Sequence, residues 1–157
     1  MSKDPRFKKA VFLVLQKLSY RPRSSSEITE YLKEKSYDEP IIREVIDHLA
    51  RIGYVNDVEF ADYWVEGRRK RKPIGHLALK RELEEKGLSE DLVEKIIEKE
   101  KGSSDEYGAA RQVAMDRIKK MGDIDKRKAK KRVYDYLLRR GFEFDTVYKV
   151  LDEVFKG

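Results

Sequence analysis

The sequence predicts an all-α protein made of three tandem three-helix repeats, which would stack into an elongated, curved array. Two observations predict this fold class. Apolar residues recur at helical spacing in nine segments, and no segment keeps the period-two alternation of a strand. In addition, three segments that begin at Glu30, Arg81 and Asp135 align without gaps, at spacings of 51 and 54 residues.

The aligned segments share both apolar positions and a turn. The coincident apolar residues are Leu32, Leu83 and Leu137, then Ile42, Val93 and Val147, then Val45, Ile96 and Val150, then Ile46, Ile97 and Leu151. Unrelated amphipathic helices would match in period but would not share the turn position of Ser36, Gly87 and Gly141. A unit of about 50 residues buries little surface alone and gains stability by stacking on its neighbours. We place the repeats at residues 1–55, 56–102 and 103–157.

The first repeat contains three predicted helices. An apolar stripe runs from Arg6 to Leu18 and is broken at Arg21-Pro22. Ser24 precedes Glu27 by three residues, which is the spacing of a capping box at a helix start. A third helix is expected from about Asp38 to Ile52, with Gly53 as its stop.

The second repeat follows the same plan. Asn56 and Glu59 form another capping-box pattern, and the helix that they open should end near Lys72 because Pro73 disfavours helical backbone before it. A short helix then stops at Gly87, and Ser89 starts the next one.

The third repeat completes the series. Ser103 to Glu106 gives a third capping-box pattern, and Gly122 marks a turn after the first helix. The following stripe ends at Gly141, and a last helix reaches Val154.

Composition excludes several classes of protein. The 157 residues include no Cys, which removes disulfides, thiol nucleophiles and Cys-based metal sites and is typical of a reducing compartment. No apolar run approaches the roughly 18 residues that span a bilayer, and no signal-peptide pattern opens the chain. We therefore expect a soluble, cytoplasmic protein without membrane contacts, and nothing in the sequence suggests more than a monomer.

Charge is segregated along the chain, although the formal net charge is only +6. Residues 64–81 hold seven bases and one acid, and residues 117–132 hold nine bases and two acids. Between them, residues 82–106 hold ten acids and four bases. Separated blocks of this kind favour a charged partner, although solvated helix faces with local ion pairs would produce them too.

Catalytic patterns are lacking. The sequence has no phosphate-binding glycine loop and no G-x-S-x-G motif. His48 falls at the boundary of a helix face, and His76 is a lone histidine in a loop, which makes a poor metal site. We expect no enzymatic activity, no catalytic residues, no metal and no cofactor.

The basic runs are the candidate binding residues. They suit phosphate contacts that do not read sequence. They comprise Arg68, Arg69, Lys70, Arg71, Lys72, Lys80, Arg81, Lys126, Arg127, Lys128, Lys130 and Lys131. Trp64 could stack on a base, but its alignment with Phe60 and Ala61 favours core packing.

One stretch resembles a known family. Asp57, Phe60, Ala61, Trp64, Val65 and Arg68, followed by Lys72-Pro73, Gly75, Leu79, Glu82-Leu83 and Lys86-Gly87, resemble the central signature of the RecX family. The preceding segment, residues 53–57, resembles the family's link between its first two repeats. His76 stands where a Pro is common, and Ser36 replaces a frequent Gly.

This resemblance implies a function in DNA repair, recombination and the SOS response. The expected partner is the filament of RecA on single-stranded DNA, which a RecX protein blocks or destabilises, lowering recombinase, ATPase and co-protease activity. Whether DNA or RecA contacts dominate stays open. The alternative is a stand-alone nucleic-acid-binding protein built from helix-turn-helix-like units. Its binding would not depend on base sequence, because the chain's one Asn and two Gln offer little for reading bases.

Overall fold

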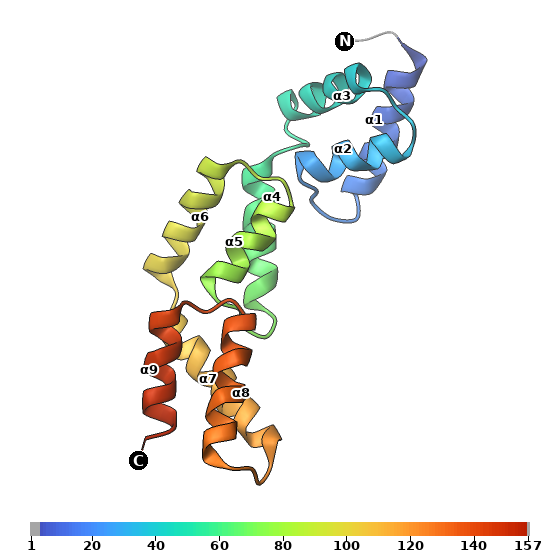
Figure 1. Cartoon of the computed structure of the whole chain (residues 1–157). Helices are drawn as coiled ribbons and strands as arrows, with labels where there is room; N and C mark the ends of the chain where they lie inside the picture. The colour runs from blue at the N-terminus through green and yellow to red at the C-terminus, as the bar shows by residue number, and fades with distance from the viewer. Residues whose placement is uncertain (1–3, 157) are drawn as a thin grey trace. The chain divides into compact units, whose positions relative to one another are not determined.

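The computed structural model describes residues 4–156, and every regular element in that range is a helix. The described elements are α1 (Pro5–Leu18), α2 (Ser25–Glu34), α3 (Glu39–Arg51), α4 (Asp57–Arg69), α5 (His76–Glu85), α6 (Glu90–Ser103), α7 (Glu106–Met121), α8 (Lys126–Arg139) and α9 (Phe144–Val154) (Figure 1). The prediction of an all-α protein with three helices in each of three groups is confirmed.

Two of the predicted helix starts have the expected caps. Ser24 caps α2 as a complete capping box, because its hydroxyl accepts from the backbone of Glu27 and the Glu27 carboxylate accepts from the backbone of Ser24. At the start of α4, the Asn56 side chain accepts from the backbone N–H groups of Val58 (2.9 Å) and Glu59 (3.2 Å). Both caps satisfy donors that the first helical turn leaves free.

Two boundaries differ from the prediction. Helix α4 ends at Arg69 rather than near Lys72, and the Arg71 N–H bonds back to the Arg68 carbonyl at 3.2 Å in a tight closing turn. Ser103 does not cap α7, because it is the last residue of α6, where its hydroxyl donates to the Lys99 carbonyl. Asp105 caps α7 instead, accepting from the N–H of Gly108 at 2.9 Å.

The shared turn has left-handed backbone in all three groups of helices. Ser36 has φ 68°, Gly87 has φ 79° and Gly141 has φ 86°. Ser36 is the one non-glycine residue with positive φ in the described part of the chain, a conformation that glycine adopts at less cost. The sequence alignment therefore found a position that is defined by backbone conformation.

The chain divides into two compact units. The first contains the described residues up to Trp64 together with Leu83–Leu92. Its core lies among α1, α2 and α3 and comprises Phe7, Ala10, Val14, Ile28, Leu32, Ile41, Ile42, Val45, Leu49 and Val55. These residues are the apolar stripes of the first repeat, packed inward as helix amphipathicity requires.

The second unit contains Val65–Glu82 and the described residues from Val93 onward. Its core lies among α7, α8 and α9 and comprises Ala110, Val113, Ala114, Val133, Leu137, Phe142, Val147, Val150 and Leu151. Small alanines on α7 sit beside larger side chains from α8 and α9, which allows close helix packing.

In the first unit, α2 is joined to the turn before α6. The Ser24 hydroxyl donates to the Lys86 carbonyl (2.8 Å), and the Ser25 N–H donates to the Asp57 carboxylate (2.8 Å). A Cβ added at Gly87 would lie 2.3 Å from the Cβ of Ser26, so the turn and the helix start touch. We call this set of contacts the first junction.

In the second unit, a corresponding set joins α5 to the turn before α9. The Gly75 N–H donates to the Arg140 carbonyl (2.8 Å), and the Leu77 N–H donates to the Gly141 carbonyl (3.1 Å). Glu106 accepts the backbone N–H of His76 at 3.1 Å. We call this set the second junction.

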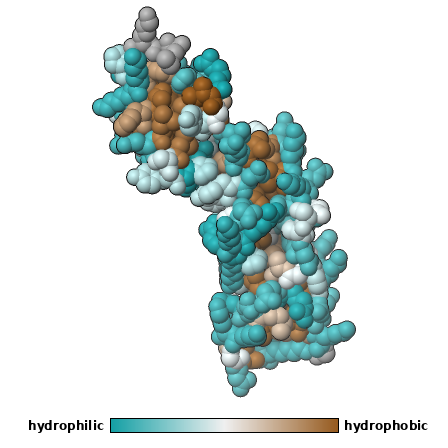
Figure 2. Space-filling view, turned by 180° about the vertical axis from the view of Figure 1, so that it is seen from behind, coloured by the Kyte–Doolittle hydropathy of each residue, from teal (hydrophilic) through white to brown (hydrophobic). Residues whose placement is uncertain are grey.

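The surface is strongly charged. Figure 2 shows hydrophilic residues over most of the visible face, with apolar residues gathered in patches between them. Among residues 4–156, no helix is both long enough and apolar enough to cross a membrane.

Candidate nucleic-acid and partner interface

The basic run that follows Trp64 is divided by the end of α4. Arg68 and Arg69 lie in the last helical turn, whereas Lys70, Arg71 and Lys72 lie in the connection to α5 and are exposed. The connection holds three consecutive cations outside regular structure, where their side chains are not confined to one helix face.

Both helical arginines are held by carboxylates. Arg68 forms a two-pronged ion pair with Glu82, in which its Nε donates to one carboxylate oxygen at 2.7 Å and a terminal nitrogen donates to the other. Arg69 contacts Glu66 at 3.1 Å and the buried Glu100 at 2.8 Å. Such pairs fix the guanidinium groups in place. Arg68 and Arg69 therefore have a structural task that the basic run alone did not reveal.

Lys72 lies in a cluster of cations around Tyr136. Its ammonium donates to the Tyr136 hydroxyl and lies 4.8 Å from the centre of the ring. Arg117 and Arg139 lie 4.5 and 5.8 Å from the same ring centre. The hydrogen bond from Lys72 lowers the pKa of Tyr136, and the charges of Lys72, Arg140 and Arg117 lower it further, against the effect of burial. Lys72, Arg117, Arg139 and Tyr136 form what we call the Tyr136 cluster.

Additional lysines adjoin this cluster. Lys72, Lys119 and Lys120, with Asp116, line a hollow of about 310 Å³. Four of these bases were not among the predicted site residues: Arg117, Lys119, Lys120 and Arg139. The high base count of residues 117–132 gave a signal for all of them except Arg139. Their association with Lys72 depends on tertiary packing.

Lys80 and Arg81 lie exposed on α5. Lys80 lines a hollow of about 330 Å³ with Ile97, Lys101 and the acidic residues Glu94 and Glu98. Lys80 is thus placed in surroundings of mixed charge rather than in a purely basic patch.

The bases of the third group lie at the start of α8. Lys126, Arg127, Lys128, Lys130 and Lys131 are all exposed, and the buried Ala129 between them anchors this turn. Lys131 pairs with Asp135 at 3.5 Å. Cations in a first helical turn oppose the helix dipole. The helix dipole therefore does not explain the placement of Lys126, Arg127 and Lys128 in the first turn.

The two basic sets do not converge on one patch of the second unit. Lys72 adjoins Tyr136, in the C-terminal half of α8, whereas Arg127 and Lys130 lie at the other end of that helix, in a hollow lined also by Tyr134. Tyr134 and Tyr136 are two positions apart and so point about 200° away from each other around the helix. The unit therefore carries two basic surfaces, one on each flank of α8.

Trp64 takes part in packing. It is half-buried, its ring stacks on Phe60 with centroids 6.0 Å apart, and the ammonium of Lys86 lies 4.8 Å from its centre. These contacts support the interpretation of Trp64 as a packing residue.

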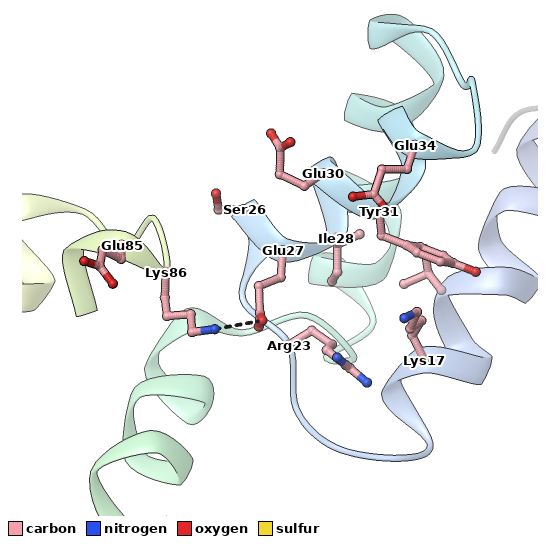
Figure 3. Close-up of a pocket in the computed structure, with 11 residues that line it drawn as sticks. Lys17, Arg23, Ser26, Glu27, Ile28, Glu30, Tyr31, Glu34, Glu85 and Lys86 are labelled. Atoms are coloured by element: carbon pink, nitrogen blue, oxygen red, sulfur yellow. Dashed lines mark hydrogen bonds and ion pairs between the residues drawn. The ribbon is translucent and has the colours of Figure 1, made fainter. Parts of the chain in front are cut away.

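A further hollow, of about 310 Å³, lies in the first unit between α1, α2 and the end of α5 (Figure 3). Lys86 reaches Glu27 at 3.3 Å there, and Glu27 also pairs with Arg21 at 2.9 Å. Lys17 lies against the Tyr31 ring at 4.7 Å. Four acids and three bases line this hollow, so its charge strongly favours neither an anion nor a cation.

His76 lies in a helix and beside a carboxylate, contrary to the expectation from sequence, because it is the first residue of α5. Its Nδ1 lies 2.5 Å from the Glu106 carboxylate, and its Nε2 lies 3.1 Å from the Ser104 hydroxyl. That hydroxyl donates to the Glu100 carbonyl at 2.7 Å, so its proton points away from the imidazole. A serine nucleophile needs the opposite arrangement. The contacts fit a structural role, and the described residues contain no group of three or more His, Cys, Asp or Glu that could hold a metal ion.

Together, the helices define a class of protein built from tandem three-helix domains. Family models for the first, second and third three-helix domains of RecX match residues 13–49, 56–96 and 104–151. The chain is 30% identical to a regulatory protein RecX of Amycolatopsis mediterranei, over 96% of this chain and 85% of that protein. It belongs to the RecX family.

Further relatives and a solved structure are also RecX proteins. The chain is 31% identical to regulatory protein RecX of Chlorobium phaeobacteroides, over 96% of each chain. It is 35% identical to that of Bacillus pumilus over 89% of its own length, but spans only 53% of that longer protein. A crystal structure of RecX from Lactobacillus salivarius matches 94% of this chain and 96% of its own with a TM-score of 0.80, at 21% identity. That likeness establishes the shared fold.

Proposed function

We propose that this chain is a regulator of the RecA recombinase that binds the RecA filament on single-stranded DNA and inhibits its recombinase, ATPase and co-protease activities. The observation that carries the proposal is that all three RecX domain models match in order along the chain. The protein would act in the cytoplasm as a monomer, in DNA repair, recombination and the SOS response.

The distribution of charge supports a partner that carries both signs. The two flanks of α8 present cations suited to DNA phosphates or to acidic protein surface. Helix α6 presents the exposed acids Glu90, Glu94 and Glu98 at four-residue spacing, which places them along one face. A filament of protein on DNA offers counterparts for both surfaces.

The experiment that tests this function is a titration of RecA, single-stranded DNA and ATP with the protein. ATP turnover should fall at sub-stoichiometric amounts, because one bound regulator affects several subunits of a filament. Unchanged turnover at excess protein would refute the proposal.

Among the predicted site residues, the exposed bases are proposed as the contacts. Replacing Arg127 and Lys130 together by Glu should weaken inhibition, because the change reverses two charges without breaking an ion pair described for the fold. Lys8→Glu with Lys9→Glu on α1 is the matched control, since both residues are exposed on a helix and carry the same charge. Equal inhibition by the two double variants would exclude this flank of α8.

The alternative is a nucleic-acid-binding protein that acts without RecA. It predicts tight binding to DNA in the absence of RecA together with unchanged ATP turnover. The same titration separates the two functions.

A further inference from the structure

Three aromatic side chains form a row along the groove between α8 and α9. Phe144 and Tyr148 stack with centroids 6.3 Å apart and planes 23° from parallel. Tyr148 and Tyr134 follow with centroids 6.0 Å apart. The row spans one flank of α8 and the outer face of α9.

Packing of the core does not account for this row. Tyr134 lies at the edge of the core of α7, α8 and α9. Phe144 and Tyr148 extend beyond it and leave 56% and 54% of their surfaces exposed. A single exposed aromatic residue is normal, but Phe144 and Tyr148 stack on each other, and contiguous exposed apolar surface marks an interaction site.

Cations border the same groove. Arg127, Lys130 and Lys131 line a hollow of about 480 Å³ together with Tyr134, Tyr148, Leu151 and Asp152. Three bases face one acid in this hollow, so its charge attracts an anion. The long side chains of Arg127 and Lys130 are exposed and can extend along a bound chain.

We propose that the groove between α8 and α9 binds single-stranded nucleic acid, with unpaired bases stacking on Phe144 and Tyr148 and phosphates lying on Arg127, Lys130 and Lys131. The combination of exposed rings with bordering cations is what such a strand requires, because each base offers a flat face and each linkage a negative charge. An acidic polypeptide would satisfy the cations but would leave the stacked rings without a matching surface. The inference deepens the proposed function, since it names the part of the filament that this groove would contact.

The test compares two oligonucleotides of equal length and charge by fluorescence anisotropy. One is oligo(dT), and the other is an abasic strand that has the same phosphates and no bases. The intact protein should bind oligo(dT) more tightly than the abasic strand. Phe144→Ala with Tyr148→Ala should weaken oligo(dT) binding by about tenfold or more and should leave abasic binding nearly unchanged.

The cations should behave differently. Arg127→Gln with Lys130→Gln should weaken binding of both strands and reduce the slope of log affinity against log salt by about 1.4, because each phosphate contact on a single strand contributes about 0.7. Tyr20→Ala is the control for loss of an exposed tyrosine, since Tyr20 is 84% exposed in the first unit. Circular dichroism of each variant checks that the helices are retained.

Three results would overturn the inference: equal affinity of the intact protein for the two strands, unchanged oligo(dT) binding by the aromatic double variant, or displacement of oligo(dT) by oligo-glutamate at equal charge concentration. The last result would assign the groove to an acidic protein segment. Failure of the proposed function is distinguishable, because unchanged RecA ATP turnover would refute that function while the oligonucleotide results stood.

Discussion

The first and second junctions bring corresponding chain segments together with different atoms. In the first, the Ser24 hydroxyl reaches the Lys86 carbonyl. In the second, Gly75 stands at the place of Ser24, and its backbone N–H makes the same bond directly to Arg140. A serine side chain therefore spans a gap that glycine closes by backbone approach, because glycine has no Cβ to keep the chains apart.

The acidic residue of each junction also differs in its contacts. Asp57 accepts from the backbone and the hydroxyl of one residue, Ser25. Glu106 accepts the backbone N–H groups of both His76 (3.1 Å) and Glu143 (3.2 Å), and it also contacts the His76 ring. Each acid is the first residue of its helix. The second junction therefore concentrates more of its contacts on a single carboxylate.

Ser36 is tolerated where Gly87 and Gly141 stand in the other turns because the space around the three residues differs. A Cβ at Gly87 or Gly141 would lie 2.3 Å from Ser26 or 2.2 Å from Ala78, respectively. Ser36 is exposed, so only the conformational cost of its positive φ applies. Gly87 and Gly141 therefore need both a left-handed backbone and the absence of a Cβ. Ser36 needs only the left-handed backbone.

The largest effect is expected for Gly141→Ala. The added methyl group would clash with the backbone of Ala78 at 2.4 Å and would also strain a residue with φ 86°. We expect a loss of about 3 kcal/mol or more in the free energy of unfolding. Gly53→Ala is the matched control, because Gly53 has the same φ of 86° with nothing within 4 Å of the added atom. That change should cost only about 1 kcal/mol. Equal losses in urea unfolding would show that the close contact is unimportant.

The next effect is expected for Glu106→Ala. The change leaves two backbone N–H groups and the His76 ring without their acceptor, so it should cost about 2–3 kcal/mol. Asp57→Ala in the first junction removes the acceptor of one backbone N–H and one hydroxyl, and it should cost about 1–2 kcal/mol. Urea unfolding of both variants measures the difference. A greater loss for Asp57→Ala would reverse the ranking of the two junctions.

These junctions mark the limit of what the sequence could predict. Periodicity located each helix of residues 4–156, and capping patterns located the starts at Ser24 and Asn56, because those signals are local. Alignment of the repeats found the position shared by Ser36, Gly87 and Gly141. It did not find the residues that pack against Gly87 and Gly141. Ser26 and Ala78 are brought to the turns by packing of segments that lie far apart in the chain.

The candidate site was predictable to a similar degree. The sequence identified exposed cations such as Lys130, but it did not reveal that Glu82 and Glu100 hold Arg68 and Arg69. It did not single out Phe144 and Tyr148, because their stacking and their place beside Tyr134 depend on how α8 and α9 pack. Exposure depends on tertiary packing, which no local pattern encodes.

A smaller effect is expected from acid. Burial opposes ionisation of Glu106, but the hydrogen bonds from His76 and from the Glu143 backbone outweigh it and lower its pKa below the ordinary value of 4.5. A carboxyl with a lowered pKa in the folded state contributes its stability fully above about pH 4.5, and this contribution is lost as pH falls through the lower folded value.

Glu106→Gln should therefore lose stability at pH 7 and show a flatter decline below pH 4.5 than the intact protein. Thermal unfolding across pH 3–7 measures the slope. Glu27→Gln should flatten the decline as well, because Arg21 and the Ser24 backbone lower the pKa of Glu27 against burial. An unchanged slope in Glu106→Gln would exclude an ionised carboxylate at the second junction.

The smallest effect concerns salt. Lys86 and Arg140 occupy corresponding places, but Lys86 pairs with the Glu27 carboxylate, whereas the Arg140 guanidinium donates to the carbonyls of Lys72 (3.0 Å) and Pro73 (2.8 Å). Lys86→Gln should cost about 0.5–1 kcal/mol at low salt, and most of that cost should disappear at 1 M salt because the pair is partly exposed. Arg140→Gln should cost a similar amount at both salt concentrations, since a carbonyl acceptor carries no net charge to screen. If salt reduced both costs equally, the conclusion that Lys86 acts through an ion pair and Arg140 through neutral carbonyl acceptors would be wrong.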